Sequence, residues 1–422
     1  MSNNKYQMLN SCTPFIVGMG VISSAGIGIS KTLESFQHPR REPKPVTLFE
    51  SPLTLPVFEV DGFSVPPELE KMRTHALALA AVREALAEAK LSDLSDKRVG
   101  IALGTTVASQ LNDLEFYKAW RNDHSAPMDA VDRFLSGNLA EWIARELGAN
   151  GPAVTVVNAC SSGTDAIGTA LGWLQNGQCD IAIAGGADEL NRVPLCGFNA
   201  LGVASEEPCK PFDKNRSGLN LGEGAGVLVL ETEASATARG VSSNLVLAGY
   251  GSAVDAHHLT APHPEGRGLR RAIFQALENA DIGAEEIAFI NAHGTSTREN
   301  DKIEGATLMD LFGETPILST KGYTGHTLGA AGGLEAVFTA LGLSKGWIPA
   351  SAGFQTLDEE IGFFPTLASR RIGKKADGKT EISGDYALST SLAFGGSNAA
   401  LVIQCVQGHF SSQRRRESGA FL

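Results

Sequence analysis

The stretch VVNACSSGTDAIGTA, residues 156–170, places a single cysteine between an apolar β-branched run and a run of small residues. The first run predicts a buried strand and the second a closely packed helix. Cys160 at this junction would face the unpaired N–H groups of the first helical turn, which favour a thiolate able to attack a carbonyl. Free cysteine is also among the most buried and inert residue types, so this segment alone leaves Cys160 open between nucleophile and packing residue.

The composition of the 422-residue chain is that of an ordinary globular protein, with 43% hydrophobic and 19% charged residues. No apolar run reaches the roughly 18 to 20 residues of a membrane span, and no secretory signal is predicted. The six cysteines show no CxxC spacing, which disfavours a disulfide framework or a metal site and favours a reducing, cytoplasmic location. The net charge of −12 disfavours nonspecific nucleic-acid binding.

Apolar runs alternate with helical patterns along the chain, which predicts an α/β fold. Helical periodicity is clear at 68–89, 268–280 and 328–344. The predicted strands are 15–22, 99–104, 153–157, 180–186, 226–231, 245–251, 287–292, 316–320, 386–391 and 399–404.

The two halves of the chain repeat one plan. A strand, a turn and Cys-x-x-Gly open a small-residue helix in 153–174, and 316–343 repeats this with His-x-x-Gly. We infer an internal duplication, with an N-terminal half over 1–245 and a C-terminal half over 246–406. The polar, arginine-bearing segment 407–422 is predicted to be a disordered tail.

FINAHGTSTREND, residues 289–301, carries His293 from a strand end into a loop of small polar residues. A histidine at the mouth of a strand favours a functional role over core packing. The hydroxyls of Thr295 and Thr297 are able to bind a polar, amide-bearing ligand, but they suit turns and helix caps equally well.

STKGYTGHTLGAAGGLEA, residues 319–336, holds Lys321 and His326 in a glycine-bearing loop before a helix that contains Glu335. The helix carries Ala, Gly and Leu on its face, so it is predicted to be buried, and a buried lysine and glutamate need partners. One cysteine, two histidines and a lysine on strand-end loops together indicate a thiol site with electrophilic helpers.

Two more glycine-bearing segments bear on the site. SLAFGGSNAA, residues 391–400, puts Phe394 before Gly395, where a turn leaves a backbone N–H accessible, although Phe394 would also suit a core. PFDKNRSGLNLGEGAG, residues 211–226, lacks the Lys-Ser/Thr ending of a P-loop, which disfavours that phosphate-binding motif.

The ordered set NACSSG, PFDKNRSGLNLGEGAG, NAHGTSTREND, STKGYTGHTLGAAGGLEA and AFGGSN resembles the β-ketoacyl-[acyl-carrier-protein] synthases of type I/II, over about residues 14 to 405. The resemblance implies a thiolase fold, with two duplicated α/β halves in a five-layered αβαβα arrangement. It also implies a homodimer whose active sites lie near the interface.

The implied reaction is a decarboxylating Claisen condensation in fatty-acid, polyketide or polyene chain elongation. Cys160 matches the nucleophile that takes an acyl chain from acyl carrier protein. His293 and His326 match the pair that assists decarboxylation of malonyl-carrier protein and stabilises the enolate. Lys321 matches the lysine that maintains the charge pattern, and Phe394 matches the aromatic gate. The N–H groups of Cys160 and Phe394 would form an oxyanion hole.

The resemblance further implies that substrates arrive on the phosphopantetheine of acyl carrier protein, with no cofactor or metal in the enzyme itself. Thr295 and Thr297 match hydroxyls that contact this arm, and Gly395 of the gate loop is expected to contact substrate. Val107 and Phe198 are expected to influence chain length. The residues expected to support the site are Asp301, Glu304 and Glu335.

Three positions depart from the family pattern. Ala393 stands where glycine is usual, Asn158 where threonine is common, and Asp165 lies just behind the nucleophile. These departures favour a specialised pathway over the housekeeping enzyme.

Partners are predicted on charge and on the motifs. Lys71, Arg73 and Lys210 form a candidate patch for the acidic carrier protein, with scattered solvated side chains as the alternative. The active half of a heterodimer with a chain-length-factor subunit is a second possibility. A coenzyme A-dependent thiolase would need a second cysteine near the C-terminal glycine pair, and AFGGSN has none.

Overall fold

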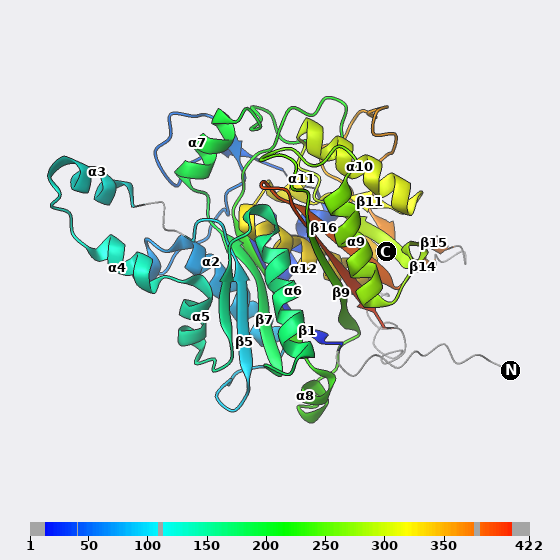
Figure 1. Ribbon diagram of the computed structural model, residues 1–422, viewed down its shortest axis with the longest axis horizontal. Helices are drawn as coiled ribbons and strands as arrows, with labels where there is room; N and C mark the ends of the chain where they lie inside the picture. The colour runs from blue at the N-terminus through cyan, green and yellow to red at the C-terminus, as the bar shows by residue number, and fades with distance from the viewer. Residues whose placement is uncertain (1–12, 40, 109–112, 375–379, 407–422) are drawn as a thin grey trace.

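The computed structural model describes residues 13–39, 41–108, 113–374 and 380–406. Its dominant feature is one large mixed sheet with helices on both faces (Figure 1). All ten predicted strands form in it, although 316–320 yields only two paired residues. The strands on its main path are β1 (Phe15–Ser23), β5 (Val99–Gly104), β6 (Ala153–Val156), β7 (Ile181–Asp188), β8 (Gly224–Glu231), β9 (Leu245–Val254), β10 (Ile287–Asn291), β11 (Ile317–Leu318), β16 (Tyr386–Leu392) and β17 (Ser397–Cys405).

The sheet consists of two parts with the same topology. The N-terminal part has the order β6-β5-β7-β8-β1 and the C-terminal part β11-β10-β16-β17-β9. In each part the first three strands are parallel and the last two pair antiparallel. A single residue pair, Phe15 with Val246, joins β1 to β9. The internal duplication is therefore present in the fold.

Helices and apolar clusters complete five layers. One cluster lies under α2 and α5, a second around α6 and α12 between the two parts, and a third under α9 and α10. α12 is buried on every side, and apart from Glu335 and Thr339 its buried residues are apolar, as expected of a central helix. The helices are α1 (Ile29–Gln37), α2 (Arg73–Glu88), α3 (Leu114–Asp123), α4 (Asp129–Ser136), α5 (Leu139–Leu147), α6 (Ser162–Gln175), α7 (Arg192–Ala200), α8 (Glu233–Ala238), α9 (Arg267–Ala280), α10 (Arg298–Phe312), α11 (Lys321–Thr324) and α12 (Ala331–Lys345).

The small residues of the opening motif allow α6 and α12 to meet at their N-terminal ends. A Cβ on Gly163 would lie 2.7 Å from the backbone nitrogen of Gly333, so only glycine fits at this contact. Each helix follows a 3-10 turn that starts with a left-handed non-glycine residue, Ala159 in one half and Leu328 in the other. Cys160 therefore corresponds to Gly329 in the repeat, and the alignment of Cys-x-x-Gly with His-x-x-Gly is three residues out of register.

Two helices, α3 and α4, lie away from this core and project from the body at the left of Figure 1. Among the residues that the structure describes, no helix is long and apolar enough to cross a membrane. The predicted domain boundary near residue 245 stays a prediction, and the predicted tail, 407–422, falls outside the described residues.

Candidate active site

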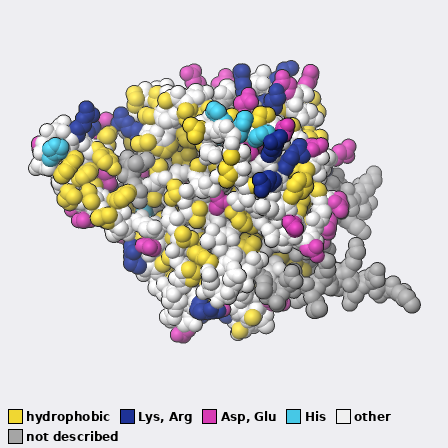
Figure 2. Space-filling view, viewed as in Figure 1, with side chains coloured by type: hydrophobic (Ala, Val, Ile, Leu, Met, Phe, Trp, Pro, Cys, Tyr) yellow, Lys and Arg dark blue, Asp and Glu magenta, His cyan; other side chains and the backbone are white. Residues whose placement is uncertain are grey.

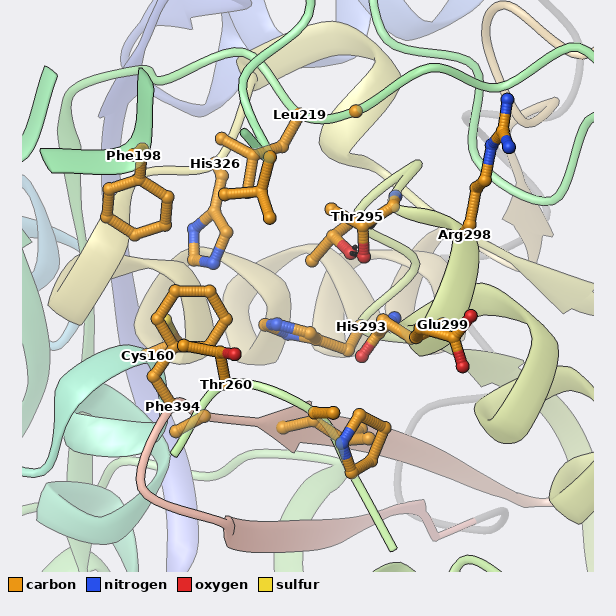
Figure 3. Close-up of a pocket in the computed structure, with 18 of the residues that line it drawn as sticks. Cys160, Phe198, Leu219, Thr260, His293, Thr295, Arg298, Glu299, His326 and Phe394 are labelled. Carbon is orange, nitrogen blue, oxygen red and sulfur yellow. Dashed lines mark hydrogen bonds between the residues drawn. The ribbon is translucent and has the colours of Figure 1, made fainter. Parts of the chain in front are cut away.

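A cavity of about 520 Å³ opens where the two halves meet, at the carboxyl ends of the strands (Figure 3). Segments from both halves of the chain line it, so the fold assembles residues that are far apart in the sequence, such as Cys160 and Phe394. The predicted site residues that line the cavity are Cys160, Phe198, His293, Thr295, Thr297, His326 and Phe394.

Cys160 lies in the 3-10 turn Ala159–Ser161, immediately before α6. Its side chain is buried, and Ala159 holds the turn in a left-handed conformation with a φ of 47°. Burial raises the pKa of the Cys160 thiol to about 11, against the opposing effects of the Lys321 ammonium and the Phe394 N–H. The sequence favours a thiolate at this position, whereas the buried environment in the structure favours the thiol, because burial outweighs the neighbouring charge.

His293 follows β10 and is fixed at its Nδ1 side. Lys321 Nζ lies 3.0 Å from His293 Nδ1 and donates to the His293 carbonyl at 2.6 Å. An ammonium has only donors, so Nδ1 must accept and the ring proton belongs on Nε2. Burial lowers the pKa of His293 well below its usual value, with Lys321 and His326 adding to the effect. The side chain is therefore a neutral imidazole with an Nε2–H donor.

His326 has the same tautomer for a different reason. The backbone N–H of Leu328 donates to His326 Nδ1 at 3.1 Å, which leaves the proton on Nε2. Burial and Lys321 lower the pKa of His326 well below its usual value. The two imidazoles lie 5.2 Å apart between ring centroids and 85° apart in plane. Figure 3 shows both rings pointing into the space beside Phe394. Two neutral N–H donors at one cavity suit an oxyanion.

Lys321 and Glu335 form a buried ion pair behind His293. Both side chains are 3% exposed, and Lys321 Nζ contacts Glu335 Oε1. Burial raises the pKa of Glu335 to about 7 even though Lys321 lowers it. The expectation that this lysine and this glutamate are buried and need partners is confirmed, because each is the other's partner.

Glu304 and Asp301 hold the loop that carries His293. Glu304, from α10, accepts hydrogen bonds from the N–H groups of His293 at 2.7 Å and Gly294 at 2.8 Å. Asp301 accepts from the N–H of Ser296 at 3.1 Å. Both carboxylates are fully buried, and burial raises the pKa of each. These contacts hold the backbone of the loop after β10 and so fix the position of the His293 side chain.

Thr295 and Thr297 share a hydrogen bond of 2.9 Å between their hydroxyls and face the outer part of the cavity (Figure 3). In that view Thr295 lies between His293 and Arg298, and Arg298 extends away from the imidazoles. The two hydroxyls thus belong to the lining of the same cavity as the imidazoles.

Phe394 is carried on a tight loop between β16 and β17. Gly395 and Gly396 have φ values of 89° and 83°, a left-handed region that glycine adopts without strain. The Phe394 ring stacks on Phe198 at 5.4 Å between centroids, and the Phe394 N–H opposes the rise that burial causes in the pKa of the Cys160 thiol. The loop therefore brings an aromatic ring and a backbone donor to the cysteine.

Two predicted substrate-contacting residues do not line the cavity. Val107 is buried, and its N–H lies 3.3 Å from Asp188 Oδ1. Gly395 is exposed, and its N–H donates to the carbonyl of Leu259 at 2.7 Å. Their roles in substrate binding stay predictions.

The proposed basic patch does not exist as a unit. Arg73 donates to both carboxylate oxygens of the fully buried Glu223, at 2.8 and 2.6 Å, so this arginine is a structural side chain. Lys210 pairs with Glu207 at 2.7 Å, and Lys71 borders a separate small hollow. The sequence shows that these three side chains are cations but does not show that Glu223 binds one of them.

The sequence analysis did not identify Asp188 as a site residue. This fully buried carboxylate at the end of β7 accepts from Thr106 N at 2.8 Å and from Gly329 N at 2.7 Å. It thereby ties a loop of the N-terminal half to the turn that follows His326. An acidic residue that ends an apolar strand, as in IAIAGGAD (181–188), is the signal that would have found it.

Family models and similar proteins agree with this geometry. The chain matches the model "Beta-ketoacyl synthase, N-terminal domain" over residues 55–236 and the model "Beta-ketoacyl synthase, C-terminal domain" over residues 245–355. It is 32% identical to the 3-oxoacyl-[acyl-carrier-protein] synthase 2 of Staphylococcus aureus, over 92% of this chain and 97% of that protein.

Two solved structures share the fold. A chain of the ishigamide ketosynthase/chain length factor aligns with a TM-score of 0.85 and 33% identity, over 94% of this chain and 99% of that one. A chain of a type II polyketide synthase acyl-carrier protein in complex with its ketosynthase aligns with a TM-score of 0.83 and 26% identity, over 94% of this chain and 99% of that one. The chain therefore belongs to the β-ketoacyl synthase family.

Proposed function

We propose that this protein catalyses a decarboxylating Claisen condensation. An acyl chain on Cys160 is joined to malonyl-acyl carrier protein, which gives β-ketoacyl-acyl carrier protein and carbon dioxide. The observation that carries this proposal is the placement of Cys160 beside two imidazoles, both of which present Nε2–H to the same cavity. The family membership and the carrier-protein names of its relatives support the substrate class.

The first half-reaction transfers the acyl chain. The Cys160 sulfur attacks the thioester carbonyl of acyl-carrier protein, and the carrier's thiolate leaves. The proton released by the Cys160 thiol ends on that thiolate, so the step is neutral overall. Negative charge develops on the carbonyl oxygen, and the N–H groups of Cys160 and Phe394 stabilise it. One such donor is worth roughly 3 to 4 kcal/mol in the transition state.

The second half-reaction uses the histidines. The carboxylate of malonyl-carrier protein leaves as carbon dioxide, and the electron pair moves onto the thioester oxygen as an enolate. The Nε2–H groups of His293 and His326 stabilise this oxygen, because neutral imidazoles present donors without adding a proton to it. The enolate carbon then attacks the acyl-Cys160 carbonyl, and the Cys160 thiolate leaves and takes up a proton.

The outer cavity suits the carrier's arm. Thr295 and Thr297 are polar groups on the path to Cys160, and the amides of phosphopantetheine need such partners in a buried channel. Lys321 and Glu335 lie behind His293 and hold its tautomer rather than touching substrate.

Intact-mass spectrometry tests the reaction. The full chain is incubated with an acyl-carrier protein and then with malonyl-carrier protein. The expected result is an enzyme mass raised by one acyl group, followed by a carrier mass that fits the β-ketoacyl product. Cys160→Ala should abolish the acyl-enzyme. Acylation that persists in Cys160→Ala would overturn the role of Cys160, and equal turnover with coenzyme A thioesters would indicate a thiolase instead.

We propose a dimer as the working assembly, formed with a chain of the same fold. β6 lies at one end of the sheet path with no further strand beside it in the described residues, and Val157, just past its end, is 67% exposed. Apolar side chains also gather on the projecting arm (Figure 2). The exposed ones on α3, α4 and the turn between them are Tyr117, Trp120, Met128, Phe134 and Leu135.

Two partners fit this surface, a second copy and a chain-length-factor subunit. The second is favoured by the likeness to the ishigamide ketosynthase/chain length factor. Native mass spectrometry distinguishes them. The chain is purified alone and, in a second sample, after co-expression with a candidate chain-length-factor subunit. A dimeric mass for the chain alone supports the homodimer, a dimer only on co-expression supports the heterodimer, and a monomer in both samples overturns the proposal.

A further inference from the structure

Asn158, two residues before Cys160, connects the nucleophile turn to the gate loop. Its Oδ1 accepts a hydrogen bond of 3.0 Å from the Ser397 hydroxyl, 239 residues further along the chain. Its Nδ2 donates to Asp165 Oδ2 at 2.6 Å. The side chain therefore has both of its polar ends engaged, one in each half of the molecule.

The same carboxylate extends the connection. Asp165 Oδ1 accepts from the Tyr250 hydroxyl at 2.8 Å, and Asp165 Oδ2 accepts from the Ser161 hydroxyl at 2.8 Å. Tyr250, from β9, lies against Gly168, where a Cβ would come within 2.5 Å of its ring. We call the set Asn158, Asp165, Tyr250 and Ser397 the Asn158 clasp.

Ser397 is also the base of the loop that carries Phe394. The Ala393 N–H donates to the Ser397 carbonyl at 2.7 Å, which closes the turn around Phe394. Gly396 is fixed from the same strand, because the Asn398 side chain donates to its carbonyl at 2.9 Å. A displacement of Ser397 would therefore move the Phe394 N–H relative to the Cys160 sulfur.

We propose that the Asn158 clasp positions the Phe394 N–H against Cys160 and so sets the rate of acyl transfer. Asn158 and Ser397 are positioning residues here, since neither lines the cavity. This inference rests on the proposed condensation.

The clasp predicts a loss of acyl transfer without a loss of malonyl decarboxylation. Acyl transfer depends on the N–H groups of Cys160 and Phe394, whereas decarboxylation depends on the Nε2–H groups of the two histidines. His293 and His326 are held by Lys321 and by the Leu328 N–H, which are not part of the clasp. Loosening the gate loop should therefore slow acyl transfer and leave the decarboxylation of malonyl-carrier protein unchanged.

The test uses Ser397→Ala, which removes the hydroxyl and keeps the backbone contact with Ala393. The maximal single-turnover rate of acyl-enzyme formation from acyl-carrier protein should fall about tenfold. Complete removal of one oxyanion-hole donor lowers a rate by about a hundredfold or more, and here the Phe394 N–H is displaced rather than removed. The half-saturating carrier concentration and the decarboxylation of malonyl-carrier protein should stay within twofold of wild type. Ser397→Thr keeps the hydroxyl and should restore the rate.

Two further variants separate positioning from general loosening. Tyr250→Phe removes the outer hydrogen bond of the clasp and should reduce acyl transfer less than Ser397→Ala does. Ser243→Ala removes a hydrogen bond far from the clasp and within the N-terminal half, the 2.6 Å bond from the Ser243 hydroxyl to the Ile16 carbonyl, and should leave acyl transfer unchanged.

The outcomes are distinct. Wild-type acyl transfer from Ser397→Ala would overturn the clasp, as would an equal loss of decarboxylation accompanied by a lower unfolding midpoint. Failure of the wild-type chain to form an acyl-enzyme would instead refute the proposed condensation.

Discussion

Replacement of Lys321 by methionine should separate the stability of the site from its chemistry. The Lys321 ammonium makes three buried contacts, with His293 Nδ1, the His293 carbonyl and Glu335. Methionine fills a similar volume but offers no donor. The substitution therefore leaves the Glu335 carboxylate buried without its cation and leaves His293 Nδ1 without the proton donor that fixes its tautomer.

The two losses have different magnitudes and different readouts. Removing one member of a buried ion pair typically costs about 3 to 5 kcal/mol of folding free energy. The pKa of Glu335, already raised by burial to about 7, should rise further because the opposing Lys321 charge is gone. Loss of the oriented His293 donor should reduce malonyl decarboxylation by about 10² to 10³, the range measured for one oxyanion-hole donor.

A double variant, Lys321→Met with Glu335→Leu, distinguishes the two effects. Replacing both members of a buried pair by apolar residues is often neutral for stability, so the double variant should regain most of the unfolding free energy. It should not regain decarboxylation, because His293 Nδ1 still lacks its donor.

The assays are urea unfolding for stability and the mass of acetyl-carrier protein formed from malonyl-carrier protein for decarboxylation. His326→Ala serves as a matched loss of the other donor. The reasoning would be refuted if the double variant decarboxylated at a rate within threefold of wild type. It would also fail if Lys321→Met lost less than about 1 kcal/mol of stability.

Two further predictions concern pH. Burial lowers the pKa values of His293 and His326 well below the usual range, so both imidazoles should stay neutral between pH 8 and pH 6. Burial raises the pKa of Glu335 to about 7, so any fall in decarboxylation over this range should come from Glu335 and should disappear in Glu335→Gln. A fall that persists in Glu335→Gln would show that an imidazole titrates there. Burial raises the pKa of Cys160 to about 11, so its alkylation by iodoacetamide, followed by intact mass, should accelerate roughly tenfold per pH unit between pH 7 and 10, and a plateau by pH 8 would contradict this.

The strands and the main site could be predicted from the sequence because their signals are local. Apolar β-branched runs formed strands where expected, and Cys160, His293 and His326 sit at strand or helix ends that face one edge of the sheet. The predicted helix over 68–89 begins later, at Arg73, after a separate 3-10 turn at Pro67–Leu69. Proline at the start of that turn fits its first position and does not continue a long helix.

The features that could not be predicted from the sequence depend on contacts between segments that are far apart in it. Nothing near Arg73 in the sequence shows that Glu223, 150 residues away, binds its guanidinium. The hydrogen bond from Ser397 to Asn158 spans 239 residues and has no local pattern. The direction of the Cys160 pKa shift also needed the structure, since a helix start favours thiolate but only the packing around it shows how far water is excluded.

The glycine contact between α6 and α12 limits which hybrid proteins can be made from the halves of two related chains. Because Gly163 of one half touches the backbone of Gly333 in the other, each half is shaped to accept the other's lack of a side chain. A hybrid that combines one half of this chain with the opposite half of a relative should assemble only if both glycine positions travel together. The two halves therefore constrain each other's sequence at this contact, and they should be exchanged between relatives only as a pair.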